Sequence, residues 1–385
     1  MKILFVHNEY AAFSGEENSI RELTAMLREG GHEVELFTKS SSEIGGSFRN
    51  RVGAFFKGIC NPSAAGELDR ILERFRPDIV QVQNIYPFIS SAIFPVIRKR
   101  GIPIVMRCPN YRLFCPNGLC LRRSGEVCEE CFGGREYCCL LHNCEGNPLK
   151  SLGYALRNRR SRVSGHISDN VDIFIVQSQF QREKFAANGI PEEKIRILPG
   201  ICPEVAGDNA DGPLGDWVSY VGRVSPEKGI YEFIGAAADN PGIPFKVAGA
   251  PDKSFRIPDK LPSNIEFLGF LGGEELDSLY RRSRIIVVPS KWYEGFPNVI
   301  TMAMMHARPV VTTDIGAMPS IITDGVDGRV VPPASAKRLG EEIASLYSDV
   351  ALCREYGLRG RERACRDFSR VAVYGKLMEI YKELV

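Results

Sequence analysis

Two cations follow a predicted strand, Trp217–Val221, in the second half of the chain. The segment VGRVSPEKG, residues 221–229, leads from this strand into a predicted helix. We therefore expect Arg223 and Lys228 near a helix N-terminus, where backbone N–H groups already favour anions. An arginine can also hold two phosphate oxygens at once. The pattern indicates a diphosphate site; the alternative is a solvated loop with an incidental ion pair.

A glutamate follows a second predicted strand, Ile285–Pro289, within the segment PSKWYEGFPN, residues 289–298. The Glu294 carboxylate can accept hydrogen bonds from sugar hydroxyls, and Gly295 lets a ligand approach the backbone closely. The alternative is a glutamate that only caps a turn. A third loop, Asp314–Pro319, follows the next predicted strand, so we expect all three loops at one edge of a sheet.

Strands alternate with helices along the whole chain, which is typical of parallel sheets covered by helices on both faces. With 385 residues, two such domains are expected. The predicted fold is α/β, with two Rossmann-like doubly wound domains facing a cleft. The predicted domains are residues 1–200 and 214–368, joined by the Gly- and Pro-rich segment Pro199–Pro213. The predicted strands are Lys2–Val6, His32–Thr38, Ile79–Val82, Ile102–Met106, Asp172–Val176 and Lys194–Leu198, then Trp217–Val221, Phe245–Ala248, Ile265–Leu268, Ile285–Pro289 and Pro309–Thr312.

Composition limits the function classes. A formal charge of +2, with 25% charged and 44% hydrophobic residues, is ordinary for a globular protein and argues against nucleic-acid binding. The first residues, MKILFVHNEY, lack the long apolar run of a secretory signal, and no run is long enough to span a bilayer. We expect a cytoplasmic protein, with peripheral attachment at the inner face of the membrane as an alternative.

Eight of the twelve cysteines fall between residues 108 and 144, in a segment with many turn residues. In a reducing compartment such a cluster favours metal ligation over disulfides, and a long loop gains stability from a staple. The preferred set is a structural zinc held by Cys115, Cys128, Cys131 and Cys144, with Cys138 or Cys139 as substitutes. Buried free thiols are an equally weighted alternative.

Aromatic and basic residues occur together in two segments of the first half. Residues 48–57 contain FRNR and FFK, and a second run contains Arg157, Arg159, Arg160 and Arg162. Such a surface can lie on anionic lipid. The preferred interpretation is nevertheless an ordinary solvated helix face.

Four ordered segments resemble the family-4 group of retaining glycosyltransferases. They are GRVSPEKG, SKWYEGFPNVITMAM, RPVVTTDIGAMPSII and DGVDGRVVPP, from Tyr220 to about Pro333. In the N-terminal half, PDIVQVQNIYPFIS and NYRLFCPNGLCLRRSGEVCEECF resemble a bacterial branch with a Cys-rich segment.

The resemblance implies a GT-B fold and transfer, with retention of configuration, from a UDP- or GDP-sugar. The acceptor would be a glycan, a lipid-linked molecule or a small molecule, as in cell-envelope polysaccharide synthesis. Arg223 and Lys228 would hold the donor diphosphate. Glu294 would meet the donor sugar, with the backbone of Gly295, Phe296, Pro297 and Asn298 around it. Gly15 would line the cleft from the other lobe, and the C-terminal helix, residues 369–385, would return to the N-terminal domain.

The chain departs from the family pattern at several positions. The glutamate that grips the donor ribose in the family is Met302 here, and a thioether cannot accept a pair of ribose hydroxyls, a loss of about 1–3 kcal/mol. Ser320 and Pro109 stand where the family often has a glutamate and a histidine, and Gln81 and Gln83 replace two further histidines. These changes favour the alternative of a non-catalytic homologue that acts as a binding or scaffold subunit. No Asp-x-Asp motif follows a strand, so we expect no catalytic metal.

Overall fold

The computed structural model describes residues 1–10, 15–41, 48–202 and 212–385. The chain forms two compact units. The N-terminal unit comprises Met1–Arg123, Cys128–Pro199 and Tyr374–Val385, and the C-terminal unit comprises Ser124–Val127 and Gly200–Val373. The predicted linker falls largely on residues 203–211, which lie outside the described residues.

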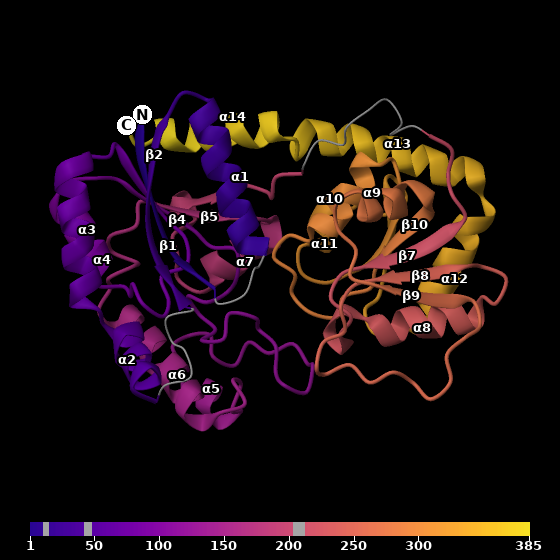
Figure 1. Ribbon diagram of the computed structural model, residues 1–385, viewed down its shortest axis with the longest axis horizontal. Helices are drawn as coiled ribbons and strands as arrows, with labels where there is room; N and C mark the ends of the chain where they lie inside the picture. Colours follow the sequence, from indigo (N-terminus) through magenta and orange to yellow (C-terminus); the bar gives the residue numbers. More distant parts are fainter. Residues whose placement is uncertain (11–14, 42–47, 203–211) are drawn as a thin grey trace. The chain divides into compact units, whose positions relative to one another are not determined.

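The N-terminal unit is built on a parallel sheet of order β2-β1-β3-β4-β5-β6. Figure 1 shows α3 and α4 on one side of this sheet and α1 on the other. Its strands are β1 (Lys2–Glu9), β2 (Glu33–Ser40), β3 (Ile79–Val82), β4 (Ile104–Arg107), β5 (Ile173–Val176) and β6 (Ile195–Ile197). Its helices are α1 (Gly15–Glu29), α2 (Phe48–Ile59), α3 (Pro62–Phe75), α4 (Ile93–Lys99), α5 (Cys138–Leu141), α6 (Pro148–Val163) and α7 (Gln179–Ala187).

The central strands of this sheet are consecutive apolar residues because both faces are covered. In β1, residues Ile3 to Val6 have no exposed surface. Helix α3 begins sharply because the Asn61 side chain accepts a hydrogen bond from the Ala64 N–H and Pro62 occupies the first turn. Because β1, β3 and β4 pair in parallel, their carboxyl ends lie at a common edge of the sheet.

The last helix of the chain, α14 (Arg370–Lys382), supplies two tyrosines to the N-terminal unit. The Tyr381 hydroxyl donates a hydrogen bond to Gln81 Oε1, and neither side chain is exposed. The half-buried Tyr374 lies within 3.1 Å of His32 Nε2 and packs against Gly30. The sheet of this unit is therefore partly covered by residues that are distant in sequence.

We expect Tyr381→Phe to lower the free energy of unfolding by about 1–3 kcal/mol, because it leaves the buried oxygen of Gln81 without its donor. Urea denaturation measures this loss. Tyr374→Phe is the matched control in the same helix, and its loss should be smaller because that hydroxyl is nearer to water. Equal losses for the two variants would contradict the prediction.

The C-terminal unit is built on a second parallel sheet, of order β12-β11-β10-β7-β8-β9. One face is covered by α8 and α12, and the other by α9, α10 and α11. Its strands are β7 (Trp217–Val221), β8 (Phe245–Ala248), β9 (Ile265–Gly269), β10 (Ser283–Val288), β11 (Val310–Thr313) and β12 (Gly328–Val331). Its helices are α8 (Ile230–Asp239), α9 (Gly273–Arg282), α10 (Asn298–Met305), α11 (Met318–Ile321), α12 (Ala336–Ser348) and α13 (Val350–Asp367).

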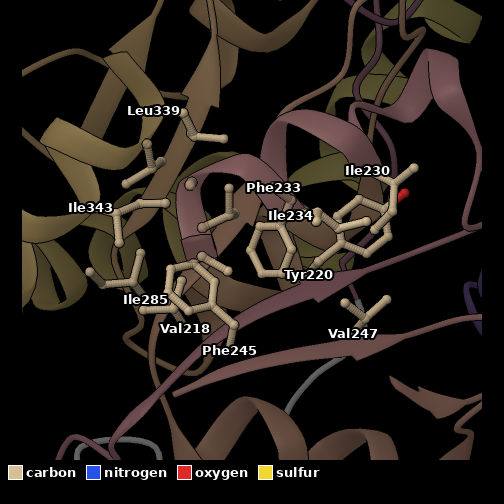
Figure 2. Packing of buried hydrophobic residues seen from close by; sticks show 14 of the residues in the cluster. Val218, Tyr220, Ile230, Phe233, Ile234, Phe245, Val247, Ile285, Leu339 and Ile343 are labelled. Atoms are coloured by element: carbon tan, nitrogen blue, oxygen red, sulfur yellow. The ribbon is translucent and has the colours of Figure 1, made fainter. Parts of the chain in front are cut away.

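A row of aromatic rings fixes α8 against this sheet. Figure 2 shows Phe233 between Tyr220 and Phe245. The ring centroids lie 5.7 Å from Phe233 to Tyr220 and 5.2 Å from Phe233 to Phe245, the latter pair in an edge-to-face arrangement. Leu339 and Ile343 of α12 complete this core. The packing holds α8 and the loop before it in a defined position relative to β7 and β8.

The predicted fold class is confirmed: both units are doubly wound parallel sheets. The eleven predicted strands are all present, with ends that differ by up to about three residues. Strand β12 was not predicted. It has only four residues, and it lies at the edge of the sheet beside β11.

Candidate functional site

Loops that follow β7 and β10 meet in the C-terminal unit. Gly229 has a φ of +77°, and a Cβ atom there would lie 1.9 Å from the carbonyl oxygen of Pro289. Only glycine fits this approach. The Lys291 N–H donates to the Glu227 carbonyl oxygen at 2.8 Å, which ties the same two loops together. Arg223, Lys228 and Glu294 are thus brought to one edge of the sheet.

Three donors converge on one oxygen of Glu294. Its Oε1 accepts hydrogen bonds from Lys228 Nζ at 2.6 Å, Ser290 Oγ at 2.7 Å and Trp292 Nε1 at 2.9 Å. The carboxylate is buried, with 6% of the residue exposed. The Lys228 ammonium also lies over the Trp292 ring, 5.4 Å from its centroid. The glutamate is held as a fixed anion beside a fixed cation.

The other oxygen, Oε2, has no hydrogen-bond donor within the described part of the chain. Burial alone would raise the pKa of Glu294, but the charge of Lys228 and the three hydrogen bonds outweigh it and lower the pKa. The carboxylate is therefore ionised at neutral pH and keeps one oxygen for a ligand.

The loop after β11 packs directly against Glu294. Gly316 has a φ of +62°, and a Cβ atom there would lie 3.0 Å from the Glu294 backbone nitrogen. Thr313 Oγ1 donates to the Ser290 carbonyl oxygen at 2.6 Å. The loop after β10 therefore contacts both of the other loops singled out from the sequence.

Arg223 is half-exposed and engaged in two ion pairs. Its guanidinium contacts Glu227 at 2.6 Å and Asp252 at 3.4 Å. Hydrogen bonds from Ser254, and then the charge of Arg223, lower the pKa of Asp252. The incidental ion pair weighed as an alternative is thus present, and a phosphate would share this guanidinium with carboxylates.

The N-terminus of α10 lies shortly after Glu294 in the chain, with Pro297 at the cap position. Among the residues that the structure describes, no side chain accepts from the first-turn N–H groups of Asn298 and its successors. Such a helix end attracts anions.

One turn into α10, Met302 is half-buried, with its sulfur 4.0 Å from Cys202 Sγ. Phe296 packs edge-to-face on Phe368, with ring centroids 5.4 Å apart.

The remaining positions predicted from the resemblance are distributed over both units. Gly15 begins α1 in the N-terminal unit, and a Cβ atom added there would meet no atom of the described residues within 4 Å. Ser320 donates its hydroxyl to the Ala317 carbonyl oxygen at 2.6 Å, within α11. Gln81 and Gln83 are buried at the end of β3, and Pro109 follows β4.

The structure does not assemble the predicted zinc ligands. Cys115 has Cys120 and Cys131 as thiol partners, whereas Cys144 has Cys139. Within the described ranges no three His, Cys, Asp or Glu side chains are placed to hold a metal ion. All twelve cysteines are free thiols. The structure therefore does not support zinc, and the quartet Cys115, Cys128, Cys131 and Cys144 stays a prediction, because sequence spacing does not show which thiols face each other. The alternative of buried free thiols agrees with most of the described cysteines.

The second basic run does not form a single surface. Arg157 is 5% exposed and stacks 3.7 Å above the Tyr154 ring, whereas Arg162 pairs with Glu136. In α2, the exposed Phe56 neighbours Phe55, which packs on Gly153 of α6. No described helix is both long and apolar enough to cross a membrane.

Two family models match the chain. "Glycosyl transferase 4-like domain" matches residues 14–200, and "Glycosyl transferases group 1" matches residues 215–349. The chain belongs to the family-4 glycosyltransferases.

Curated relatives of this glycosyltransferase are bacterial and archaeal. An uncharacterized 42.6 kDa protein of the cps region of Klebsiella pneumoniae is 27% identical over 68% of the chain and 63% of its own length. The alpha-maltose-1-phosphate synthase of Mycolicibacterium smegmatis is 30% identical over 43% of the chain and 48% of its own length. The chain thus spans about half to two thirds of the length of these relatives.

Solved structures show the same fold over the whole glycosyltransferase chain. Sucrose-phosphate synthase from Thermosynechococcus elongatus has a TM-score of 0.70 at 18% identity, and covers 100% of this chain and 98% of its own. Anabaena HepE in complex with UDP and glucose has a TM-score of 0.66 at 15% identity, with 100% of both chains covered. At these identities the likeness establishes the GT-B fold alone.

The sequence did not identify the partners of Glu294 in this glycosyltransferase. Ser290 and Trp292 were part of the quoted motif but had no assigned role. Their positions four and two residues before Glu294, in a turn after a strand, are the only signal that the sequence offers for them.

Proposed function

We propose that this glycosyltransferase moves a sugar, with retention of anomeric configuration, from a nucleotide-sugar donor bound in the C-terminal unit to a hydroxyl-bearing acceptor. One observation carries the proposal: three donors fix Oε1 of Glu294 and leave Oε2 for a ligand. An ionised carboxylate oxygen suits the hydroxyls of a donor sugar. A purely structural glutamate would be expected to use both oxygens.

The leaving diphosphate would lie between Lys228 and the N-terminus of α10. An ammonium has three N–H donors, and Glu294 uses one of those of Lys228. The uncapped first turn of α10, which begins at Asn298, and the preceding residues Gly295 and Phe296 supply further N–H groups. Arg223 would add charge from the edge of the site. Together these groups stabilise the negative charge that develops on the diphosphate.

The acceptor hydroxyl would attack on the face that the diphosphate leaves, and the diphosphate would take its proton. No metal and no enzyme nucleophile enter this scheme. The acceptor would be a glycan, a lipid-linked molecule or a small molecule, in the cytoplasm or at the inner face of the membrane. Gly15 would contribute from the N-terminal unit, which also contains residues Tyr374–Val385.

The second candidate function is a non-catalytic binding or scaffold subunit. Met302 favours it, because this side chain packs toward Cys202 and offers no acceptor to a ribose. The two candidates differ in one property: the enzyme binds a nucleotide, and the scaffold does not.

We expect UDP- or GDP-sugars to raise the melting temperature of the purified protein. A ligand at 100 times its Kd stabilises the folded state by about 2.7 kcal/mol. A thermal-shift panel of sugar nucleotides, with UDP and GDP alone, measures the effect and names the base. A folded sample that shifts with none of them would favour the scaffold function.

A further inference from the structure

A cavity that is partly open to solvent lies within the N-terminal unit. It stands at the carboxyl ends of β3 and β4, since Gln83 and Asn84 follow β3 and Arg107 is the last residue of β4. Glu16 of α1 and Arg112 also line it. None of these side chains belongs to the cluster around Glu294.

Arg107 is a buried cation without a hydrogen-bond partner. Its side chain is 3% exposed, its Nε is fully covered, and none of the residues that the structure describes accepts a hydrogen bond from its guanidinium. Burial lowers the pKa of Arg107, and the nearby charge of Glu16 opposes this. A guanidinium nevertheless stays charged in proteins. Burying such a charge without a partner is unfavourable. An anionic ligand bound in the cavity would provide the missing partner.

Gln83 adds a second unsatisfied group. The residue is 2% exposed, and neither its amide nitrogen nor its amide oxygen has a partner within the described ranges. Buried side-chain amides are normally hydrogen-bonded in folded proteins. Two unsatisfied polar side chains on one cavity indicate a binding site more than a packing defect.

The charge of the cavity selects the ligand. Arg112 donates from Nη1 to Tyr10 Oη at 3.1 Å and to Asn84 Oδ1 at 2.8 Å, which are both neutral acceptors, and its Nε has no partner among the described residues. Among the described residues that line the cavity, Glu16 is the only carboxylate, and its Oε2 accepts from the Tyr10 hydroxyl at 2.8 Å. Two guanidinium groups therefore face one carboxylate.

We propose that this cavity binds an oxyanion, a phosphate or carboxylate group, carried by the acceptor. Arg107 supplies a planar pair of N–H donors that match two oxyanion oxygens, and Gln83 and Arg112 donate from the sides. The assignment of this anion to the acceptor rests on the proposed transferase function. The binding of an oxyanion at Arg107 does not.

Isothermal titration calorimetry with inorganic phosphate and with acetate tests the site. Saturating UDP or GDP, whichever the thermal-shift panel identifies, is present throughout, so that phosphate does not report on the C-terminal unit. We expect Arg107→Gln to weaken anion binding by about tenfold or more. Arg70→Gln, which changes an exposed arginine of α3, is the matched control and should bind as the unmodified protein does.

Stability separates lost binding from lost folding. Arg107→Gln removes an unpaired buried charge, so its melting temperature in anion-free buffer should equal or exceed that of the unmodified protein. Phosphate should raise the melting temperature of the unmodified protein and not that of this variant. Equal anion binding by the two proteins, or no binding of either anion by the unmodified protein, would overturn the proposal.

Titration with the same nucleoside diphosphate keeps this outcome distinct from the proposed function, because Arg107→Gln should bind that nucleotide with unchanged affinity. The source of the anion is resolved by two further probes. Tighter binding of glucose 6-phosphate than of inorganic phosphate identifies a soluble phosphorylated acceptor. Sedimentation with phosphatidylglycerol vesicles that Arg107→Gln abolishes identifies a lipid-borne phosphate.

Discussion

Lys228→Ala is expected to lower kcat/KM for sugar transfer by about 10²–10³-fold, the range seen when one preorganised donor to a developing anion is removed. Lys228 is the best-placed cation for a diphosphate, because Glu294 and the Trp292 ring fix its position and two of its N–H groups remain for a ligand. The measurement is steady-state kinetics with the donor that the thermal-shift panel identifies. UDP affinity should fall with it.

Lys291→Ala is a closely matched control. Lys291 and Lys228 are 24% and 25% exposed, and each pairs with one glutamate, Lys291 with Glu232 at 2.9 Å. If general loss of an ion pair explained the defect, the two variants would be equally impaired. We expect Lys291→Ala to retain transfer, and a comparable loss in both would contradict a role in donor binding.

Glu294→Gln is expected to lower transfer by about 10²-fold or more while leaving the protein folded. The amide keeps the shape of the carboxylate, and its oxygen can accept from Lys228, Ser290 and Trp292. Its nitrogen then occupies the position of Oε2 and donates where a sugar hydroxyl should donate. Glu232→Gln, which disturbs the Lys291 pair instead, should remain active.

The stability of the Glu294→Gln variant should differ from that of the unmodified protein in its dependence on pH. The pKa of Glu294 is lowered in the folded protein from its usual 4.5, so the carboxylate contributes stability above pH 4.5. That contribution is lost as pH falls through the lowered folded pKa. The difference in melting temperature between the unmodified protein and Glu294→Gln should therefore be largest at neutral pH and shrink below pH 4.5. A difference that does not change with pH would show that ionisation is not involved.

The sequence predicted the sheets well because their strands are buried on both faces. Runs such as ILFV in β1 and IIVV in β10 have no alternation to misread, and glycine-containing loops separate them from helices. Strand β12 was not predicted because its sequence, GRVV, is short and begins with glycine. Strands with few apolar residues acquire their conformation from a neighbour, here β11.

The sequence predicted which residues lie at the candidate site, but it did not predict which side chains contact one another there. Arg223, Lys228 and Glu294 follow strands, so the topology alone brings them to one edge. That three donors share a single oxygen depends on the fold of a turn, which residue types do not encode in readable form. Side-chain direction caused the same failure elsewhere: Arg157 lies in an arginine run, yet it is buried against Tyr154.

The composition of the N-terminal unit has a consequence for synthesis. A ribosome makes a chain from its N-terminal side onward, and domains usually fold in that order. The hydrogen bond between Gln81 and Tyr381 cannot form until Tyr381 has been made, and Tyr381 is translated after every residue of the C-terminal unit. The C-terminal unit can complete its core first, while the N-terminal unit lacks residues Tyr374–Val385 until after residue 373 has been made. Of the two units, the one that begins to be made first is thus the one that finishes folding last.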